Sequence, residues 1–276
     1  MLTMIEVLKA ILFGVVEGIT EWLPISSTGH MILLDEFVKL NVSKEFLDLF
    51  LVVIQLGAIL AVVVIYWNKL IPLSTKQGLH ISRRKCKMWV KIIVASIPAG
   101  VVGILWDDVF TKYFYNYQTV AIMLILVGVV FIIIERSNKN KIAKIDSIDD
   151  ISYGQAFLIG VFQMIAAIFP GTSRSGSTIV GSLMLGISRT AAAEFTFFLA
   201  VPAMFGGSAI KILKYSGGFN SAEVALLAIG MIVAFVLSII AIKFLMSYIK
   251  KHDFKVFGWY RIILGIAVIG YFLAAR

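Results

Sequence analysis

The chain has little charge and a single cysteine among its 276 residues. Charged residues make up 15% of it and hydrophobic residues 60%, a balance outside the range of soluble domains. With one thiol, Cys86, the chain can form neither a disulfide framework nor a thiol-rich metal site. The N-terminus also lacks a basic stretch followed by a small-residue cleavage site, so we expect no cleavable signal. These shortages indicate a helical protein that crosses a membrane several times.

The apolar residues gather in ten stretches, most of them long enough to cross a bilayer, which takes about 20 residues. We therefore predict ten helices, which cover residues 4–23, 26–40, 45–67, 88–106, 117–136, 152–169, 173–187, 190–214, 221–249 and 256–274. The second and the seventh are short for a crossing, and a tight polar turn with a proline joins each of them to the helix before it. Such a turn is typical of a re-entrant hairpin whose tip is buried in protein.

Two polar segments interrupt the apolar sequence, one in each half. Residues 14–30 read GVVEGITEWLPISSTGH, and residues 160–178 read GVFQMIAAIFPGTSRSGST. Aligned on one another, the segments match at the pairs Gly14–Gly160, Glu17–Gln163, Pro24–Pro170 and Ser27–Ser173. Ionisable groups within apolar sequence are energetically expensive and usually functional. We therefore expect function where the two segments meet.

The predicted fold is an all-α integral membrane protein built as an inverted repeat. Each half has one re-entrant helical hairpin followed by three transmembrane helices, which gives six crossings. Because three is an odd number, the second half must enter the membrane upside down relative to the first. The whole chain, 1–276, forms a single membrane domain whose halves cover about 1–145 and 146–276. Repeats of this kind place their binding site near the middle of the bilayer, where the halves meet.

The net charge of +9 belongs to loops rather than to a nucleic-acid-binding surface. The predicted cytoplasmic loops, at 67–91, 135–152, 187–190 and 249–256, carry fifteen Lys and Arg residues, whereas the outer regions carry six. This asymmetry follows the positive-inside rule and predicts that the first hairpin enters from outside the cell. Since no basic surface with interleaved aromatic residues is evident, we expect no nucleic acid partner.

Glu17 and Glu21 are four residues apart and therefore lie on one face of the first helix. Two carboxylates in a medium of low dielectric repel each other unless a cation or a proton lies between them. The pair is suited to hold a hard divalent metal ion, or one carboxylate is suited to act as a general base. A structural role in capping or ion pairing is the alternative.

The second polar segment opens a helix with a glycine-rich turn that contains Arg174. The free backbone N–H groups and the positive dipole end of such a turn favour a phosphate group, and the arginine adds forked, charged donors. Hydroxyl groups that can add hydrogen bonds surround it, on Thr172, Ser173, Ser175, Ser177 and Thr178. Helix packing through small residues would explain the glycines and serines, but it does not explain the arginine.

The first proline turn leads into Ser26, Ser27, Thr28 and, two residues later, His30. A serine at the tip of a tight turn, near carboxylates and an imidazole, is suited to act as a nucleophile. Alternatively, Ser26 or Ser27 caps the second helix. His30 is placed to donate a proton to a leaving phosphate, although a lone helical histidine is more often a structural hydrogen-bond partner. We expect Ser26 and Thr28 to bind substrate together with Thr172, Ser173, Ser175 and Thr178.

These segments resemble the motifs of the undecaprenyl-pyrophosphate phosphatase family of the bacitracin-resistance type. The resemblance covers essentially the whole chain and rests on Glu17-Gly-Ile-Thr-Glu21, Leu23-Pro-Ile-Ser-Ser-Thr-Gly-His30 and Pro170-Gly-Thr-Ser-Arg-Ser-Gly-Ser-Thr178. It implies an enzyme of the bacterial plasma membrane that removes the terminal phosphate of a C55 polyprenyl pyrophosphate. The reaction would take place on the outer face of the membrane and recycle the carrier lipid for cell-wall synthesis.

The resemblance also implies roles for four residues and a cofactor. It makes Glu17 and Glu21 the acidic pair, Ser27 the nucleophile and Arg174 the phosphate-binding arginine, with a divalent cation, Mg or Ca, bound in the site. The implied partners are the polyprenyl pyrophosphate and the membrane lipids. Oligomeric state and preferred chain length stay open, and so does the choice between attack by Ser27 and attack by a water that Glu21 orients.

Two other classes of protein use similar features. Lipid phosphatases of the acid-phosphatase type need a K-x6-R-P element, which is missing, and a histidine six residues after their arginine, where this chain has Val180. Secondary transporters and lipid flippases use inverted repeats as well. A transporter would need an anion site but no nucleophile beside a carboxylate pair, so the chemistry of the site distinguishes the two.

Overall fold

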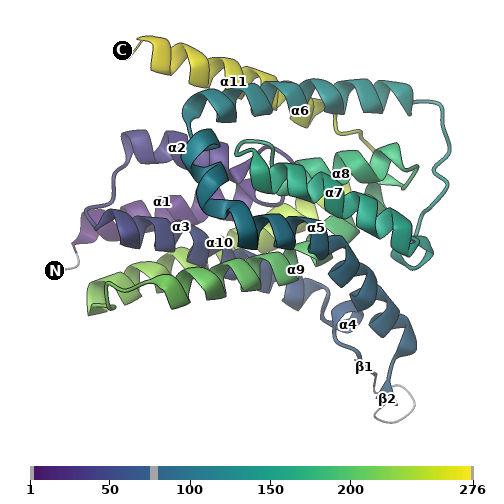
Figure 1. Ribbon diagram of the computed structural model, residues 1–276, viewed down its shortest axis with the longest axis horizontal. Helices are drawn as coiled ribbons and strands as arrows, with labels where there is room; N and C mark the ends of the chain where they lie inside the picture. Colours follow the sequence, from purple (N-terminus) through teal and green to yellow (C-terminus); the bar gives the residue numbers. More distant parts are fainter. Residues whose placement is uncertain (1–2, 75–79, 275–276) are drawn as a thin grey trace.

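The computed structural model describes residues 3–74 and 80–274, and these residues are almost entirely helical (Figure 1). The helices are α1 (Met4–Thr20), α2 (Ser27–Phe37), α3 (Lys44–Ile65), α4 (Trp67–Leu70), α5 (Arg83–Phe114), α6 (Tyr117–Ser137), the short 3-10 helix η1 (Ile148–Asp150), α7 (Tyr153–Ile168), α8 (Arg174–Met184), α9 (Arg189–Lys214), α10 (Ser221–Tyr248) and α11 (Lys255–Ala274). Two short strands, β1 (Leu73–Ser74) and β2 (His80–Ile81), pair antiparallel between α4 and α5. Lys76 and Arg276, which entered the charge comparison, lie outside the described residues.

All ten predicted helices are present, and most of their ends are within a few residues of the prediction. The largest difference is α5, which spans Arg83–Phe114 instead of 88–106 and continues through Pro98. Its additional first turn is strongly basic, so hydropathy alone does not reveal it. The one-turn helices α4 and η1 and the strand pair are too short to leave a hydrophobic period in the sequence.

Among the described residues, six helices are long and apolar enough to cross a membrane, namely α3, α5 up to Trp106, α6, α9, α10 and α11. The other four long segments are shorter: α1 and α7 have 17 and 16 residues, and α2 and α8 have 11 each. At about 1.5 Å per residue, an 11-residue helix covers roughly half of a ~30 Å hydrocarbon core. The chain is therefore an all-helical membrane protein with six candidate spans.

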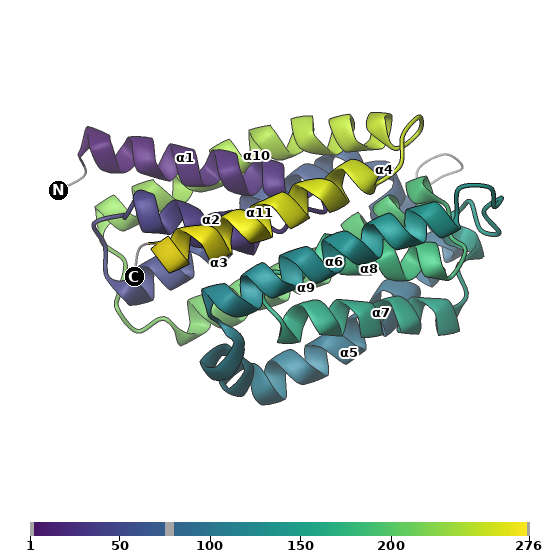
Figure 2. The same ribbon diagram turned by 90° about the horizontal axis from the view of Figure 1, so that it is seen from above.

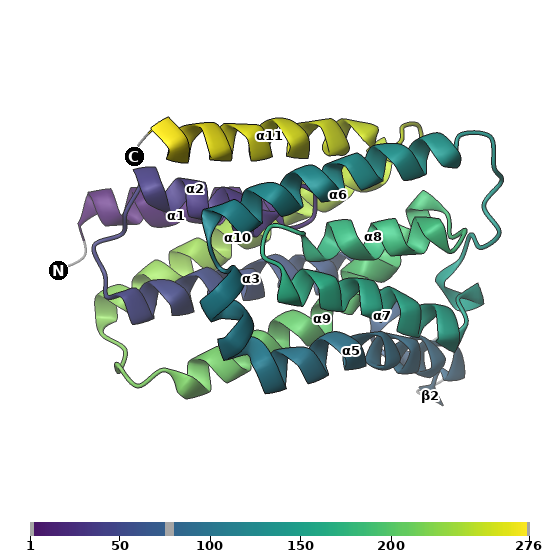
Figure 3. The ribbon, with the colours of Figure 1, turned by 45° about the horizontal axis from the view of Figure 1, so that its top comes forward.

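The four short helices form two hairpins that start at opposite ends of the molecule (Figures 2 and 3). Each pair, α1–α2 and α7–α8, turns back at a tip in the interior. The first helix of each hairpin packs on a long helix of the other half, α1 on α10 and α7 on α5. Small residues allow this approach: a Cβ at Gly14 would come within 2.7 Å of the Gly230 carbonyl oxygen, and one at Gly160 would collide with the Ala95 backbone.

The two tips share an unusual backbone conformation. Ser26 and Ser173 are the only non-glycine residues with positive φ among those described, at 74° and 68°. Each caps a helix, since the hydroxyl of Ser26 accepts from the Gly29 N–H and that of Ser173 from the Gly176 N–H. The strain of this conformation marks both tips as functional candidates.

The cap positions correct the predicted alignment of the two segments. Ser173 corresponds in structure to Ser26, not to Ser27, because the second turn has one more residue between its proline and its cap. That turn includes Gly171, whose φ of +87° suits only glycine and whose Cβ would come within 2.5 Å of the Val120 carbonyl oxygen. Ser27 and Arg174 therefore hold equivalent positions, each the first residue of its helix.

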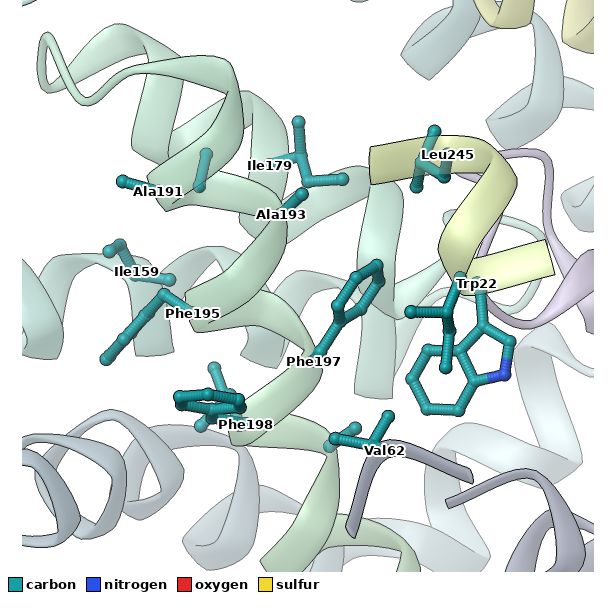
Figure 4. Packing of buried hydrophobic residues seen from close by; sticks show 14 of the residues in the cluster. Trp22, Val62, Ile159, Ile179, Ala191, Ala193, Phe195, Phe197, Phe198 and Leu245 are labelled. Carbon is teal, nitrogen blue, oxygen red and sulfur yellow. The ribbon is translucent and has the colours of Figure 1, made fainter. Parts of the chain in front are cut away.

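A large apolar cluster holds the tips against α9 (Figure 4). Trp22 is fully buried and packs edge-on against Phe197, with ring centroids 5.3 Å apart. The loops after α6 and before α11 and the start of α5 lie at the same end of the molecule (Figure 2). Many of the Lys and Arg residues lie in these loops and in the adjoining ends of α5, α6 and α11, so positive charge gathers at this end of the molecule.

Candidate active site

A cavity of about 190 Å³ lies where the two hairpin tips meet. The tips contribute charged and hydroxyl-bearing side chains, while α3 and α9 contribute small or apolar ones and the amide side chain of Gln55. The lining residues are Glu21, Ser27, Thr28, Val52, Gln55, Ala166, Pro170, Gly171, Ser173, Arg174, Ala203, Met204 and Gly207. The cavity thus combines a polar end with an apolar wall, which suits an amphiphilic ligand.

Glu21 connects the two halves of the chain at this cavity. Its carboxylate accepts a hydrogen bond from the Ser27 hydroxyl through Oε2, at 2.6 Å. Its other oxygen, Oε1, forms an ion pair with Arg174 Nη2 at 2.9 Å. A carboxylate that holds a serine proton in this way is placed to remove it, and the serine oxygen is thereby directed toward the cavity.

Arg174 is also held in place by α9. Its Nη1 donates to the Thr196 carbonyl oxygen of α9 at 3.0 Å. The side chain of Thr196 in turn hydrogen-bonds the Thr178 hydroxyl of α8 at 2.8 Å. Because Arg174 is also the first residue of α8, its charge stands beside the free N–H groups of that helix. This combination favours a phosphate group.

The remaining hydroxyl groups divide into two sets. Thr28 and Ser173 line the cavity. Ser175 donates to the Glu21 carbonyl oxygen at 3.2 Å, and Thr172 donates to the Phe169 carbonyl oxygen at 2.7 Å. Thr178 also donates to carbonyl oxygens of its own helix. Together with the capping role of Ser26, these bonds make four of the six expected substrate-binding hydroxyls part of the scaffold in this structure.

Glu17 lies one helical turn before Glu21 but outside the cavity lining. It is 1% exposed, and its Oε1 has no hydrogen-bond partner among the described residues. Within the described part of the chain, no group of three or more His, Cys, Asp or Glu residues is arranged to hold a metal ion. Among the described residues that line the cavity, Glu21 is the only one with a carboxylate.

His30 does not line the cavity either. Its Nδ1 lies 2.7 Å from the Ser26 carbonyl oxygen, and its Nε2 lies 2.6 Å from the Tyr260 hydroxyl. The two rings stack almost in parallel, with centroids 5.6 Å apart. In this structure the imidazole joins the first tip to α11.

Arg261 of α11 is a residue of the site that the sequence reasoning missed. It is fully buried, and its guanidinium donates to the Pro24, Gly171 and Thr172 carbonyl oxygens at 3.2, 2.8 and 2.9 Å. A signal was present, because an arginine inside an apolar helix is costly and usually functional. No sequence motif connects Arg261 with the tips, since α11 lies far from both polar segments in the sequence.

The fold and the site together define a helical membrane protein whose two half-chains build one cavity suited to a phosphate group on a lipid. Comparison with known protein families identifies the family to which the chain belongs. The chain belongs to the family described as bacitracin resistance protein BacA, whose pattern matches residues 10–267.

Individual relatives are similar to this chain in sequence along almost their whole length. A protein of Desulfitobacterium hafniense named undecaprenyl-diphosphatase is 63% identical over 273 residues, which are 99% of this chain and 98% of the relative. Undecaprenyl-diphosphatase 1 of Clostridium acetobutylicum is 62% identical over 269 residues, 98% of each chain. A relative from Enterococcus faecalis, again named undecaprenyl-diphosphatase, is 58% identical over 97% of this chain and 98% of its own.

Proposed function

We propose that the undecaprenyl-diphosphatase activity of this chain resides in the cavity between the two hairpin tips. The observation that carries the proposal is the chain of contacts from Ser27 through Glu21 to Arg174. Ser27 and Glu21 come from one half of the protein and Arg174 from the other, and their contacts support the roles of nucleophile, base and phosphate-binding cation at one cavity. The names of the relatives support the substrate, and membership of the bacitracin resistance family supports a role in that resistance.

Binding of the pyrophosphate would rearrange the contacts of Arg174. In the structure its Nη2 is bound to Oε1 of Glu21, so a phosphate oxygen that takes this donor separates Arg174 from the carboxylate. The substrate would thus prepare Glu21 to receive the proton of Ser27.

The reaction proceeds in two displacements at the terminal phosphorus. The Ser27 oxygen forms a bond to this phosphorus as its proton passes to Glu21. The bond to the bridging oxygen breaks, and the lipid monophosphate leaves with the electron pair. Glu21 passes this proton to the departing lipid phosphate and becomes a carboxylate again. Water then attacks the phosphoserine and gives a proton to Glu21, while the bond between phosphorus and the Ser27 oxygen breaks. Glu21 returns that proton to Ser27, and phosphate is released. Arg174 and the N–H groups of α8 stabilise the charge on the phosphoryl oxygens.

The acidic pair fits a divalent cation, Mg or Ca. The two carboxylates offer only oxygen ligands, and the buried Oε1 of Glu17 has no hydrogen-bond partner among the described residues. Oxygen ligands suit a hard ion that also binds substrate phosphates and water. Glu17 and Glu21 would hold the ion. When bound, it would offset part of the negative charge of the pyrophosphate.

The inverted repeat explains how both tips reach the same place. The opposite entry of the two hairpins, the equivalent caps at Ser26 and Ser173 and the matching packing of α1 on α10 and α7 on α5 support it. On this basis the hairpins are re-entrant and the two halves of one membrane domain, about 1–145 and 146–276, are related by inversion. The apolar wall of the cavity would receive the start of the prenyl chain, and the basic loops would face the cytoplasm.

We expect Glu21→Gln to reduce turnover more than Glu17→Gln. Glu21 contacts both Ser27 and Arg174, whereas Glu17 lies outside the cavity and acts on it through charge. The loss should be on the order of 1,000-fold for Glu21 and about 10-fold for Glu17, as expected for a general base and for a neighbouring charge. Phosphate release measured against the concentration of Mg or Ca tests both roles. If both variants keep the turnover and metal response of the parent, the pair is structural.

The basic end of the molecule should face the cytoplasm. Thr75, a natural reporter position in the first basic loop, lies outside the described residues, so Ile142 serves instead. It follows α6 at the basic end and is 94% exposed. With Cys86 replaced by serine, Ile142→Cys should resist a membrane-impermeant thiol reagent in intact cells and react after permeabilisation. Labelling in intact cells would show that the basic end faces outward and would contradict the proposed orientation.

Release of inorganic phosphate tests the function itself. The purified protein should release one phosphate from each polyprenyl pyrophosphate in detergent, where no second compartment exists. A transporter built on the same fold would release none. The contact between Ser27 and Glu21 favours the enzyme, since transport of an anion needs no serine held against a carboxylate.

A further inference from the structure

The buried Arg261 stands in a special relation to the two hairpin tips. Its Nη1 donates to the Pro24 carbonyl oxygen, and its Nη2 donates to that of Gly171. Both carbonyls lie two residues before the serine that caps the following helix, so they occupy equivalent positions in the two halves. One guanidinium thus binds corresponding atoms of both tips, and it binds the Thr172 carbonyl oxygen in addition.

This guanidinium has no acidic partner to explain its burial. Its side chain is fully buried, and none of the ion pairs among the described residues includes it. A charge inside an apolar helix is expensive, so its presence requires a role that an apolar residue cannot fill. Only the flat fork of an arginine can reach both carbonyls at once, because a lysine offers a single point of charge.

The neighbouring Tyr260 holds the first tip at a second point. Since the Ser26 carbonyl oxygen can only accept, the Nδ1 of His30 carries a proton, and a neutral imidazole then accepts from the Tyr260 hydroxyl through Nε2. Arg261 therefore contacts the turn that leads into Ser27 directly, and Tyr260 reaches the same turn through His30. Neither residue lines the cavity.

We propose that Arg261, assisted by Tyr260, is a positioning residue that keeps the two hairpin tips in register. Ser27 belongs to one tip and Arg174 to the other, and their alignment on one phosphoryl group depends on that register. The proposal rests on the proposed function of the cavity. A displacement of about 1 Å between reacting groups costs on the order of 100-fold in rate. The tail and the phosphate would still bind, because Arg174 and the α8 N–H groups lie within the second tip alone.

Steady-state kinetics of Arg261→Lys test this role. We expect turnover per folded enzyme to fall about 100-fold, with the KM for lipid and the inhibition constant of inorganic phosphate each within about threefold of the parent. Arg189→Lys is the matched control, because Arg189 forms a bidentate ion pair with Glu135 at 2.5 and 2.9 Å and lies at the basic end. This control should lower the melting temperature and leave turnover unchanged.

Three outcomes would overturn the proposal. One is Arg261→Lys with parental turnover, and another is a loss of phosphate inhibition equal to that of Arg174→Lys, which would make Arg261 a phosphate ligand. If the lysine variant does not fold, Tyr260→Phe decides, since it removes one hydroxyl from a side chain that is 43% exposed. It should lower turnover about 10-fold at unchanged KM, and parental turnover would be the third such outcome. A parent protein without phosphatase activity would instead refute the proposed function.

Discussion

Ser27→Ala should lose on the order of 1,000-fold or more in turnover, since no neighbouring group reproduces a covalent route. Among the described residues, Ser27 is the only one that lines the cavity and whose hydroxyl donates to the carboxylate of Glu21. If water attacked directly, the serine would serve only as a hydrogen-bond donor to phosphate. Its loss would then cost roughly 1–2 kcal/mol, which is about 5- to 30-fold in rate. The rate of phosphate release by the purified variant distinguishes the large loss in turnover from the small one.

Ser26→Ala is the control for this substitution. It removes an adjacent hydroxyl that caps α2 instead of facing the cavity, so stability should fall by about 1 kcal/mol while turnover changes less than in Ser27→Ala. If Ser27→Ala retains a tenth or more of parental turnover, the covalent mechanism is wrong and attack by water stands.

Arg174→Lys should lose at least about 100-fold in turnover although the positive charge remains. The guanidinium contacts Glu21 and the Thr196 carbonyl oxygen with two different nitrogens, and it would bind phosphate with the same fork. A single ammonium cannot reproduce this geometry, and removal of one such donor typically costs 100- to 1,000-fold, about 2.7–4 kcal/mol. Turnover should be measured beside the inhibition constant of inorganic phosphate, which should rise strongly.

The remote arginine variant Arg189→Lys controls for loss of an ion pair as such. Near-parental turnover of Arg174→Lys would mean that Arg174 serves the fold through its bond to Glu21 and does not bind the phosphate. A rise in the phosphate inhibition constant with unchanged turnover would show that it binds the product without acting in the chemical step.

Much of the fold could be predicted because a membrane imposes simple rules. Apolar length and turn composition give all ten main helices, and the charge asymmetry separates the loops into two groups. The local contact of Ser27 with Glu21 also follows from the sequence, since a tight turn after Pro24 must fold the chain back on its own first helix. The meeting of this tip with Arg174 could be expected because two similar polar segments must bury their polar groups together.

The rest depends on contacts between distant segments. Arg261 and Tyr260 lie 89 or more positions from the tips that they hold, so no local pattern connects them. The sequence alignment of the two tips is one residue away from the structural alignment. Sequence identity pairs Ser27 with Ser173, whereas the backbone conformation pairs Ser26 with Ser173. Nor does helical spacing distinguish Glu17 from Glu21: both share one face, but only Glu21 reaches the cavity.

The stereochemical course at phosphorus tests the central claim most directly. A substrate whose terminal phosphorus is made chiral with oxygen isotopes and sulfur would be hydrolysed in isotopically labelled water, and the configuration of the released thiophosphate determined. Each in-line displacement inverts the phosphorus. Attack by Ser27 followed by water consists of two displacements and predicts net retention. Net inversion would show a single attack by water and contradict the assignment of Ser27 as the nucleophile.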